Sequence, residues 1–334
     1  MNKRTGRIHF GVSVPQIKRS WDETATAALT FEDLGFDSLW VNDHLYGPQS
    51  PDIPILEAWS TCAGLAAVTK TCEIGTLVTP AGMRNPAHLG KVIATIDNIA
   101  NGRIIPGLGA GWMEREFIDF GMPFPSIKNR LTQLEETVQL LLKMWDPEID
   151  EVTLDGSFVK TNRLVTQPKP GRKPPLLIGG AGEKRTIPIA AQYADIYNNV
   201  AGQQEFLPRK IDVLHNACAS IGRDPNSITI SQQCLVTIAE NEDLAEPMID
   251  RASKIFGGHL GDPKGPLALS GSPEKIISQI QKHIDLGCTM FVIEFFGRDT
   301  QEPAKLFAET CLLYTSDAAD ERSSVDLGGR RIIK

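Results

Sequence analysis

The amino-acid sequence predicts a single (β/α)8 barrel, the TIM-barrel fold class. Strand-like and helix-like segments alternate almost from the first residue, and eight such pairs fit into about 310 residues, which suits a closed barrel better than an open sheet. The composition, 41% hydrophobic and 22% charged, is that of a globular protein with a substantial core. We therefore expect one barrel domain over residues 1–311.

The first half of the chain supplies four predicted strands and three predicted helices. The strands are expected at residues 8–14, 38–42, 73–79 and 104–108, and the helices at 21–34, at 55–68 and from Asn85. The helix at 21–34 is amphipathic and ends at Gly35, which accepts the left-handed conformation at little cost. Asn85-Pro86 gives the third helix a capping side chain and a proline in its first turn.

The second half continues the alternation around an insertion. The helix over 131–145 presents Leu134, Val138 and Leu141 on one face, as a core-facing helix should. Asp, Gly and Pro residues then interrupt the pattern at 146–170, where β-prone pieces at 151–153 and 157–159 predict a hairpin. The remaining strands are expected at 174–178, 194–198, 228–238 and 290–294, and the helices from Lys184, at 204–221, at 243–256, from Ser272 and at 302–312, with a loop at 257–272.

The last residues, 312–334, continue neither the helical nor the strand pattern. Their composition resembles translated adapter or vector sequence, so we leave them out of the fold prediction. We expect a non-native or disordered tail there; an ordinary flexible tail is the alternative.

Charge and composition exclude several classes of protein. A net charge of −7 argues against nucleic-acid binding by general electrostatics. No apolar run is long enough to span a membrane, and the first residues lack the apolar segment of a signal peptide. Six scattered cysteines form no C-x-x-C pair and no metal-ligand spacing, which indicates reduced thiols, a cytoplasmic location and no metal site.

Two glycine clusters follow predicted strands. Gly107, Gly109 and Gly111 lie after the fourth strand, and Gly179, Gly180 and Gly182 lie after the fifth. Bare backbone N–H groups at such positions can bind an anion. The spacing G-x-G-x-G differs from the dinucleotide-binding fingerprint G-x-G-x-x-G, which makes a Rossmann site a weak alternative. The other alternative is that these glycines only ease packing between strand and loop.

Asp43 and His44 come directly after the second predicted strand. A barrel places its chemistry in the loops that follow strands, and imidazole titrates near neutrality, so His44 is the candidate for proton transfer. His9 lies in a predicted strand, three other histidines lie in helical stretches, and His259 lies in a loop without an acidic neighbour. We assign no role to those five.

Four sequence blocks resemble the luciferase-like monooxygenase superfamily, and within it the deazaflavin (coenzyme F420) dependent oxidoreductases. The blocks are GFDSLWVNDH (35–44), IGTLVTPAGMRNPAHLGKVIATIDNIANGR (74–103), GLGAGWMEREFIDFGMPF (107–124) and IGGAGEKRTIPIAAQYADIYN (178–198). The resemblance implies a barrel of the bacterial luciferase-like type, with insertions after strands 4 and 7. It also implies a small-molecule substrate and allows a homodimer.

The resemblance further implies roles for individual residues. A bulge at strand three, often with a non-prolyl cis peptide, supports the deazaflavin ring. It falls within Thr76, Leu77, Val78 and Thr79, and we expect the cis peptide at the Leu77–Val78 bond. The residues expected to contact the cofactor phosphate through their backbone are Gly109, Ala110, Gly111, Gly179, Gly180 and Gly182, with Trp112 beside them. Asp43 and His44 match an Asp-His pair that touches the ring, and His44 handles the proton. The sugar-phosphate-oxidising branch has a carboxylate where this chain has Trp112, which argues against that substrate.

Together these features predict an F420-dependent oxidoreductase that transfers a hydride between the deazaflavin and a small organic substrate. The cofactor supplies the hydride chemistry, and the barrel orients it. A flavin mononucleotide (FMN) dependent monooxygenase of the same fold is the alternative. A cofactor-free barrel enzyme leaves both glycine clusters unexplained, and the Asp-His pair disfavours a flavin-binding protein without catalysis.

Overall fold

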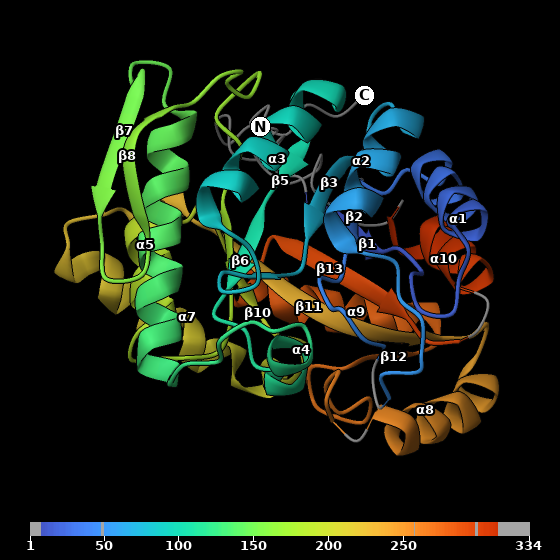
Figure 1. The fold of residues 1–334 in the computed structure, drawn as a ribbon. Helices are drawn as coiled ribbons and strands as arrows, with labels where there is room; N and C mark the ends of the chain where they lie inside the picture. The colour runs from blue at the N-terminus through green and yellow to red at the C-terminus, as the bar shows by residue number, and fades with distance from the viewer. Residues whose placement is uncertain (1–7, 48–49, 257, 298–299, 313–334) are drawn as a thin grey trace, which may run out of the picture.

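The computed structural model describes residues 8–47, 50–256, 258–297 and 300–312. Its central feature is a parallel β-barrel with helices around it (Figure 1). The barrel strands are β1 (His9–Ser13), β2 (Ser38–Val41), β3 (Glu73–Thr76) with β4 (Thr79–Pro80), β5 (Ile104–Ile105) with β6 (Gly107–Gly109), β9 (Leu177–Gly179), β10 (Ile196–Asn199), β11 (Thr229–Ile238) and β13 (Met290–Phe295).

The pairing of these strands closes the sheet on itself. From β1 the order runs through β2 to β3, which pairs with β5; β4 pairs with β6, and β6 continues through β9, β10, β11 and β13 back to β1. All of these pairs are parallel. The chain therefore forms eight strand units in a closed barrel, which confirms the predicted fold class.

Strands three and four are each split in two, where the sequence predicts continuous strands. The third divides at the Leu77–Val78 peptide bond, which is cis as predicted. The fourth divides at Pro106, which has no N–H to donate to a ladder. The two split strands pair with each other on both sides of the interruptions, β3 with β5 and β4 with β6.

Helices cover the outside of the barrel (Figure 1). Their starts follow local capping: Ser20 and Glu23 form a capping box on α1, and the Asn85 side chain accepts from the His88 amide at the start of α3. The covering helices are α1 (Trp21–Asp33), α2 (Ala58–Val68), α3 (Pro86–Ile99), α5 (Ile127–Trp145), α6 (Thr186–Tyr193), α7 (Leu207–Ser220), α9 (Pro273–Asp285) and α10 (Gln301–Phe307), and the chain also forms α8 (Glu242–Phe256). A 3-10 turn, η1 (Ala201–Phe206), precedes α7, and a π-helical turn, η3 (Ala308–Leu312), follows α10.

Additional elements follow the fourth and seventh barrel strands. The short helix α4 (Glu114–Asp119) follows β6, and α8 and the strand β12 (Leu269–Gly271) follow β11. The sequence predicts neither α4 nor β12; β12 forms because residues 269–271 pair in parallel with the end of β11.

The predicted hairpin is present beside α5, although its second strand starts later than expected (Figure 1). It consists of β7 (Glu151–Asp155) and β8 (Lys160–Val165). Residues 157–159, predicted as strand, instead form the turn, because the Glu136 carboxylate accepts hydrogen bonds from the amides of Ser157, Phe158 and Val159.

The core has two layers, inside and outside the barrel wall. Trp40, Leu77, Ile105, Leu177, Ile196, Met290 and Val292 pack inside the barrel. Gly11 and Gly75 leave room for the Trp40 ring, since a Cβ at either would lie within 2.4 Å of it. A larger apolar cluster lies between strands and helices and includes Cys311, while residues 313–334 of the predicted tail lie outside the described residues. Within the described ranges, no helix is long and apolar enough to cross a membrane.

Candidate active site

A cleft of about 850 Å³ opens at the carboxyl ends of the barrel strands. Its volume is within the range of small-molecule and cofactor sites. Residues from seven barrel strands or the loops after them line it, and they include Asn42, His44, Leu77, Val78, Gly109–Trp112, Gly179, Gly180, Asn198, Gln233 and Glu294. The loop after α8 contributes His259 and Leu260. Both predicted glycine clusters thus reach one cleft.

The glycines at this cleft occupy positions that exclude a side chain. A Cβ at Gly109 would lie 2.6 Å from Val78 Cγ2. Gly180 has a φ of +145°, which L residues rarely adopt, and a Cβ there would lie 2.9 Å from Thr186 Cγ2. The backbone of both loops is therefore close to neighbouring groups and presents little side-chain bulk to the cleft.

His44 is held by a carboxylate that lies 72 residues later in the chain. Its Nδ1 lies 3.0 and 3.1 Å from the two oxygens of Glu116, on α4. Glu116 is fully buried and also accepts hydrogen bonds from the amides of Leu45 and Tyr46. Burial acts to raise the pKa of Glu116, but the His44 ring and these two amides outweigh it and hold the pKa below its usual value.

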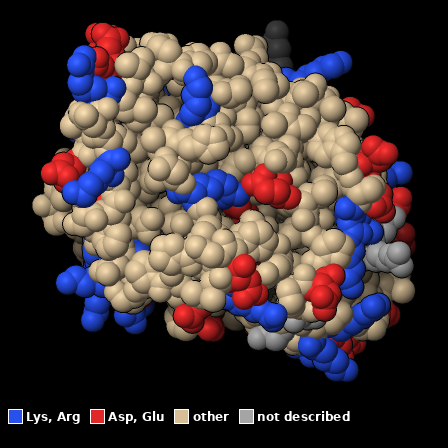
Figure 2. Space-filling view, in the orientation of Figure 1, with Lys and Arg blue, Asp and Glu red and all other residues tan. Residues whose placement is uncertain are grey.

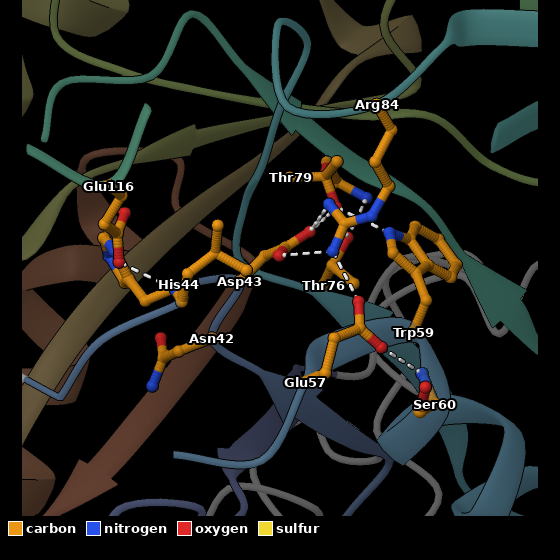
Figure 3. Close-up of polar contacts among 12 residues, drawn as sticks. Asn42, Asp43, His44, Glu57, Trp59, Ser60, Thr76, Thr79, Arg84 and Glu116 are labelled. Atoms are coloured by element: carbon orange, nitrogen blue, oxygen red, sulfur yellow. Dashed lines mark hydrogen bonds and ion pairs between the residues drawn. The ribbon is translucent and has the colours of Figure 1, made fainter. Parts of the chain in front are cut away.

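Asp43 belongs to a different cluster, although it is the neighbour of His44 in sequence. Its carboxylate binds both terminal nitrogens of Arg84, at 2.7 and 2.9 Å, and lies 2.6 Å from the Thr79 hydroxyl. Arg84 also pairs with Glu57, at the start of α2. Figure 3 shows the Asp43 side chain directed toward Arg84, and the His44 ring directed toward Glu116 on the opposite side. Burial raises the pKa of Asp43, with Arg84 and Thr79 acting in the opposite direction.

Trp112 forms an aromatic row with two histidines at the mouth of the cleft. Its ring centroid lies 5.7 Å from that of His44 and 5.4 Å from that of His259. The Trp112 side chain is 58% exposed, which is unusual for so large an apolar group. An exposed aromatic ring between two imidazoles offers a contact surface to a ligand in the cleft.

The structure brings nine of the predicted site residues to the cleft. They are His44, Leu77, Val78, Gly109, Ala110, Gly111, Trp112, Gly179 and Gly180. Asp43, Thr76 and Thr79 are buried beneath it, and Gly182 lies at the surface beside it. Glu116, and not the neighbouring Asp43, makes the carboxylate contact to the His44 ring.

Four residues of the site have no assigned role in the sequence analysis. Glu116 and Arg84 are far in sequence from the residues that they hold, so no local pattern marks them. His259 lies at the cleft although its loop offers no acidic neighbour, since its contact is the aromatic Trp112. Glu294 is the last polar side chain of a predicted strand, and its position at a strand end is a signal that could have identified it.

A protein-family model for luciferase-like monooxygenases matches residues 5–258 of this chain. The match includes Asp43, His44, both glycine loops and Trp112. The chain belongs to the luciferase-like monooxygenase family. The resemblance to this family implies a barrel with insertions after the fourth and seventh strands, and the structure has additional elements at both places.

Curated relatives are similar over most of their length. An F420-dependent glucose-6-phosphate dehydrogenase of Intrasporangium calvum is 31% identical over 302 residues, which cover 80% of this chain and 87% of the relative. A protein of the same name from Nakamurella multipartita is 24% identical over 330 residues, covering 91% and 96%.

Solved structures share the fold at lower identity. An F420-dependent secondary alcohol dehydrogenase, in complex with an F420–acetone adduct, has a TM-score of 0.77 at 22% identity, covering 91% of this chain and 98% of that one. A long-chain alkane monooxygenase also has a TM-score of 0.77, at 16% identity, covering 94% and 92%. At these identities the likeness concerns the fold alone.

Proposed function

We propose that this chain is an oxidoreductase that uses the deazaflavin coenzyme F420 and transfers a hydride between it and a small organic substrate. The observation that carries the proposal is the convergence of two glycine loops and the His44–Glu116 pair on one cleft. The names of the curated relatives, which are F420-dependent dehydrogenases, support the choice of cofactor.

The residues at the cleft fit such a cofactor. The glycine loops at Gly109–Gly111 and at Gly179–Gly180 expose backbone to the cleft with little side-chain bulk, as the approach of a phosphate requires. Leu77 and Val78 provide an apolar surface for a flat ring system. No cluster of His, Cys, Asp or Glu in the described ranges could hold a metal ion, so the proposal assigns no metal.

The chain's own residues would bind the cofactor, orient it and move a proton. A bound deazaflavin supplies a carbon that accepts or donates the hydride. His44 makes its hydrogen bond to Glu116 through Nδ1, which leaves Nε2 as the nitrogen that gives or takes the substrate proton. A well-positioned acid–base group contributes about 10²–10⁴-fold to a rate. Glu116 fixes the orientation of the His44 ring.

An FMN-dependent monooxygenase is the second candidate. Structures of the same fold include monooxygenases and an FMN-containing riboflavin lyase, and the same glycine loops would suit the FMN phosphate. A flavin-binding protein without catalysis is less well supported, because it gives no reason for a buried carboxylate to hold His44 at the cleft.

Trp112 bears on the class of substrate. The curated relatives named above act on glucose 6-phosphate by their names, but this chain places a large exposed indole at the cleft mouth. An indole offers an apolar face to its ligand, which favours a small organic substrate less polar than a sugar phosphate. A cytoplasmic location and a homodimer remain predictions that accompany this proposal.

Absorption titrations with coenzyme F420 and with FMN test the proposal and separate its two candidates. We expect the protein to bind F420 at micromolar concentration and FMN at least about tenfold more weakly, which is about 1.4 kcal/mol. Tighter binding of FMN would favour the monooxygenase, and binding of neither would overturn the assignment of a flavin-type cofactor.

A further inference from the structure

A second cavity, of about 360 Å³, lies beside the active-site cleft at the carboxyl ends of β1 and β13. Ile17, Asn42, Ile255, Phe256 and Glu294 line both this side cavity and the cleft. The two spaces therefore meet at these side chains, and two of the five are polar.

Glu294 and Asn42 face the barrel interior. Along β13, Phe291, Ile293 and Phe295 pack outward, whereas Val292 packs inside the barrel. Because alternate residues of a strand point to the same face, Glu294 lies on the face of Val292, nearer the open end. Asn42 follows β2 and lies on the face of Trp40, which also packs inside.

Over the described ranges of the chain, neither side chain has a protein partner. Within the residues that the structure describes, no hydrogen bond or ion pair engages the Glu294 carboxyl, and burial alone raises its pKa to about 7. Among the same described residues no hydrogen bond engages the Asn42 side chain, although its backbone N–H and C=O both bond to Gln16. Both side chains are partly exposed at the junction of the two cavities, so this pair is available for a ligand.

The charges around the side cavity restrict what that ligand can be. Arg19 and Arg251 line the cavity, so they disfavour a cation there. Glu294 disfavours an anion, because two like charges would share a poorly solvated space. Most of the remaining lining is apolar, including Val14, Phe295 and Phe296.

We propose that Glu294 and Asn42 anchor the substrate of this enzyme, and that the substrate is an uncharged molecule with a hydroxyl or carbonyl oxygen and an apolar body. The oxygen binds at the junction of the two cavities, where the Glu294 carboxyl accepts a hydrogen bond when ionised and can donate one when protonated, and the Asn42 carboxamide offers both a donor and an acceptor. The apolar body occupies the side cavity. That this ligand is a substrate rests on the proposed function; that it binds here does not.

The test uses four probes of one shape and different charge: benzyl alcohol, benzaldehyde, benzoate and benzylammonium. Their dissociation constants are measured by ligand-observed NMR on the full chain without cofactor, at one neutral pH. We expect the two uncharged probes to bind at least about tenfold more tightly than either charged probe. Preferential binding of benzylammonium or of benzoate would overturn the proposal.

Variants locate the interaction. Glu294→Leu removes both donor and acceptor and should weaken benzyl alcohol binding about tenfold, whereas Glu294→Gln keeps a donor and an acceptor and should stay within about threefold. Asn42→Ala should weaken it by an intermediate factor. Glu309 is exposed and lines neither cavity, so Glu309→Leu is the matched control and should bind like the native chain. If Glu294→Leu also binds benzyl alcohol like the native chain, Glu294 does not anchor the ligand and the proposal is wrong.

A separate titration with coenzyme F420 keeps this inference distinct from the proposed function. The native chain and Glu294→Leu should bind the cofactor within about twofold of each other, since the glycine loops are unchanged. Loss of cofactor binding in both would overturn the proposed function. The probe affinities alone test whether Glu294 and Asn42 anchor the ligand.

Discussion

The Asp43 carboxylate lies in a buried ion pair beneath the cleft, with both of its oxygens on Arg84 and one within 2.6 Å of the Thr79 hydroxyl. Thr79 follows the turn that ends at Leu77 and Val78, and it also accepts a hydrogen bond from the Trp59 indole. Asp43 therefore ties β2 to the strand segment after the turn, and its effect on the cleft is indirect.

Replacing Asp43 by Asn should destabilise the fold. The change removes one charge of a buried pair and turns an amide donor toward the guanidinium, so we expect a loss of about 3 kcal/mol or more in the free energy of unfolding. Asp155→Asn is the matched control, since Asp155 pairs with Lys160 at the surface and should cost less than about 1 kcal/mol. Urea unfolding of both variants measures the difference, and an equal loss in the two would contradict the structural role of Asp43.

The sequence allowed the position of His44 to be predicted, but not its partner. Asp43 and His44 are adjacent in extended chain after β2, and successive side chains of extended backbone point to opposite sides. One therefore faces Arg84 and the other faces Glu116 (Figure 3), and only His44 lines the cleft. The partner of His44 is Glu116, which only the barrel brings near. Adjacency in sequence thus places Asp43 and His44 at one strand end but does not identify the partner of either side chain.

At the scale of elements, the glycine loops after β6 and β9 define the cleft. Glycine spacing and strand ends could be read from the sequence, and both loops lie where the barrel rule places them. The split of the third and fourth strands was harder to predict from the sequence. Pro106 marks one break by its missing N–H, but the strand-three break was expected only from family resemblance. The helix α4, which carries Glu116, has six residues and no side-chain cap, so no local sequence signal predicts it.

A charge placed on the first glycine loop should weaken cofactor binding. Ala110 already carries a Cβ and is partly exposed at the cleft, so Ala110→Asp avoids the clashes that substitution of Gly109 would create. A carboxylate near a bound phosphate should weaken F420 binding about tenfold or more. Ala110→Ser keeps similar bulk without charge and should bind within about threefold of the native chain. Equal affinities in both variants would place the phosphate elsewhere.

At the scale of the whole molecule, alternation of strands and helices was enough to predict the closed barrel. The face shown in Figure 2 carries both signs of charge interspersed among uncharged residues, in keeping with a net charge of −7 and with binding through a cleft. The sequence does not predict which distant loops contact one another. His259, from the loop after α8, contacts Trp112, from the loop after β6. The side cavity likewise depends on the ends of β1 and β13, which are far apart in the chain and adjacent in the barrel.

Anaerobic turnover of coenzyme F420 by the native chain and by His44→Asn tests the central claim most directly. The two proteins are mixed with the cofactor and with a panel of small alcohols and carbonyl compounds, and the cofactor absorbance is followed with time over a range of pH. We expect the native chain to exchange a hydride without oxygen. His44→Asn should bind the cofactor within about twofold, because the glycine loops are intact, but should turn over about 10²–10⁴-fold more slowly. Turnover that needs both FMN and oxygen, or a His44→Asn variant with the native rate and pH profile, would contradict the account.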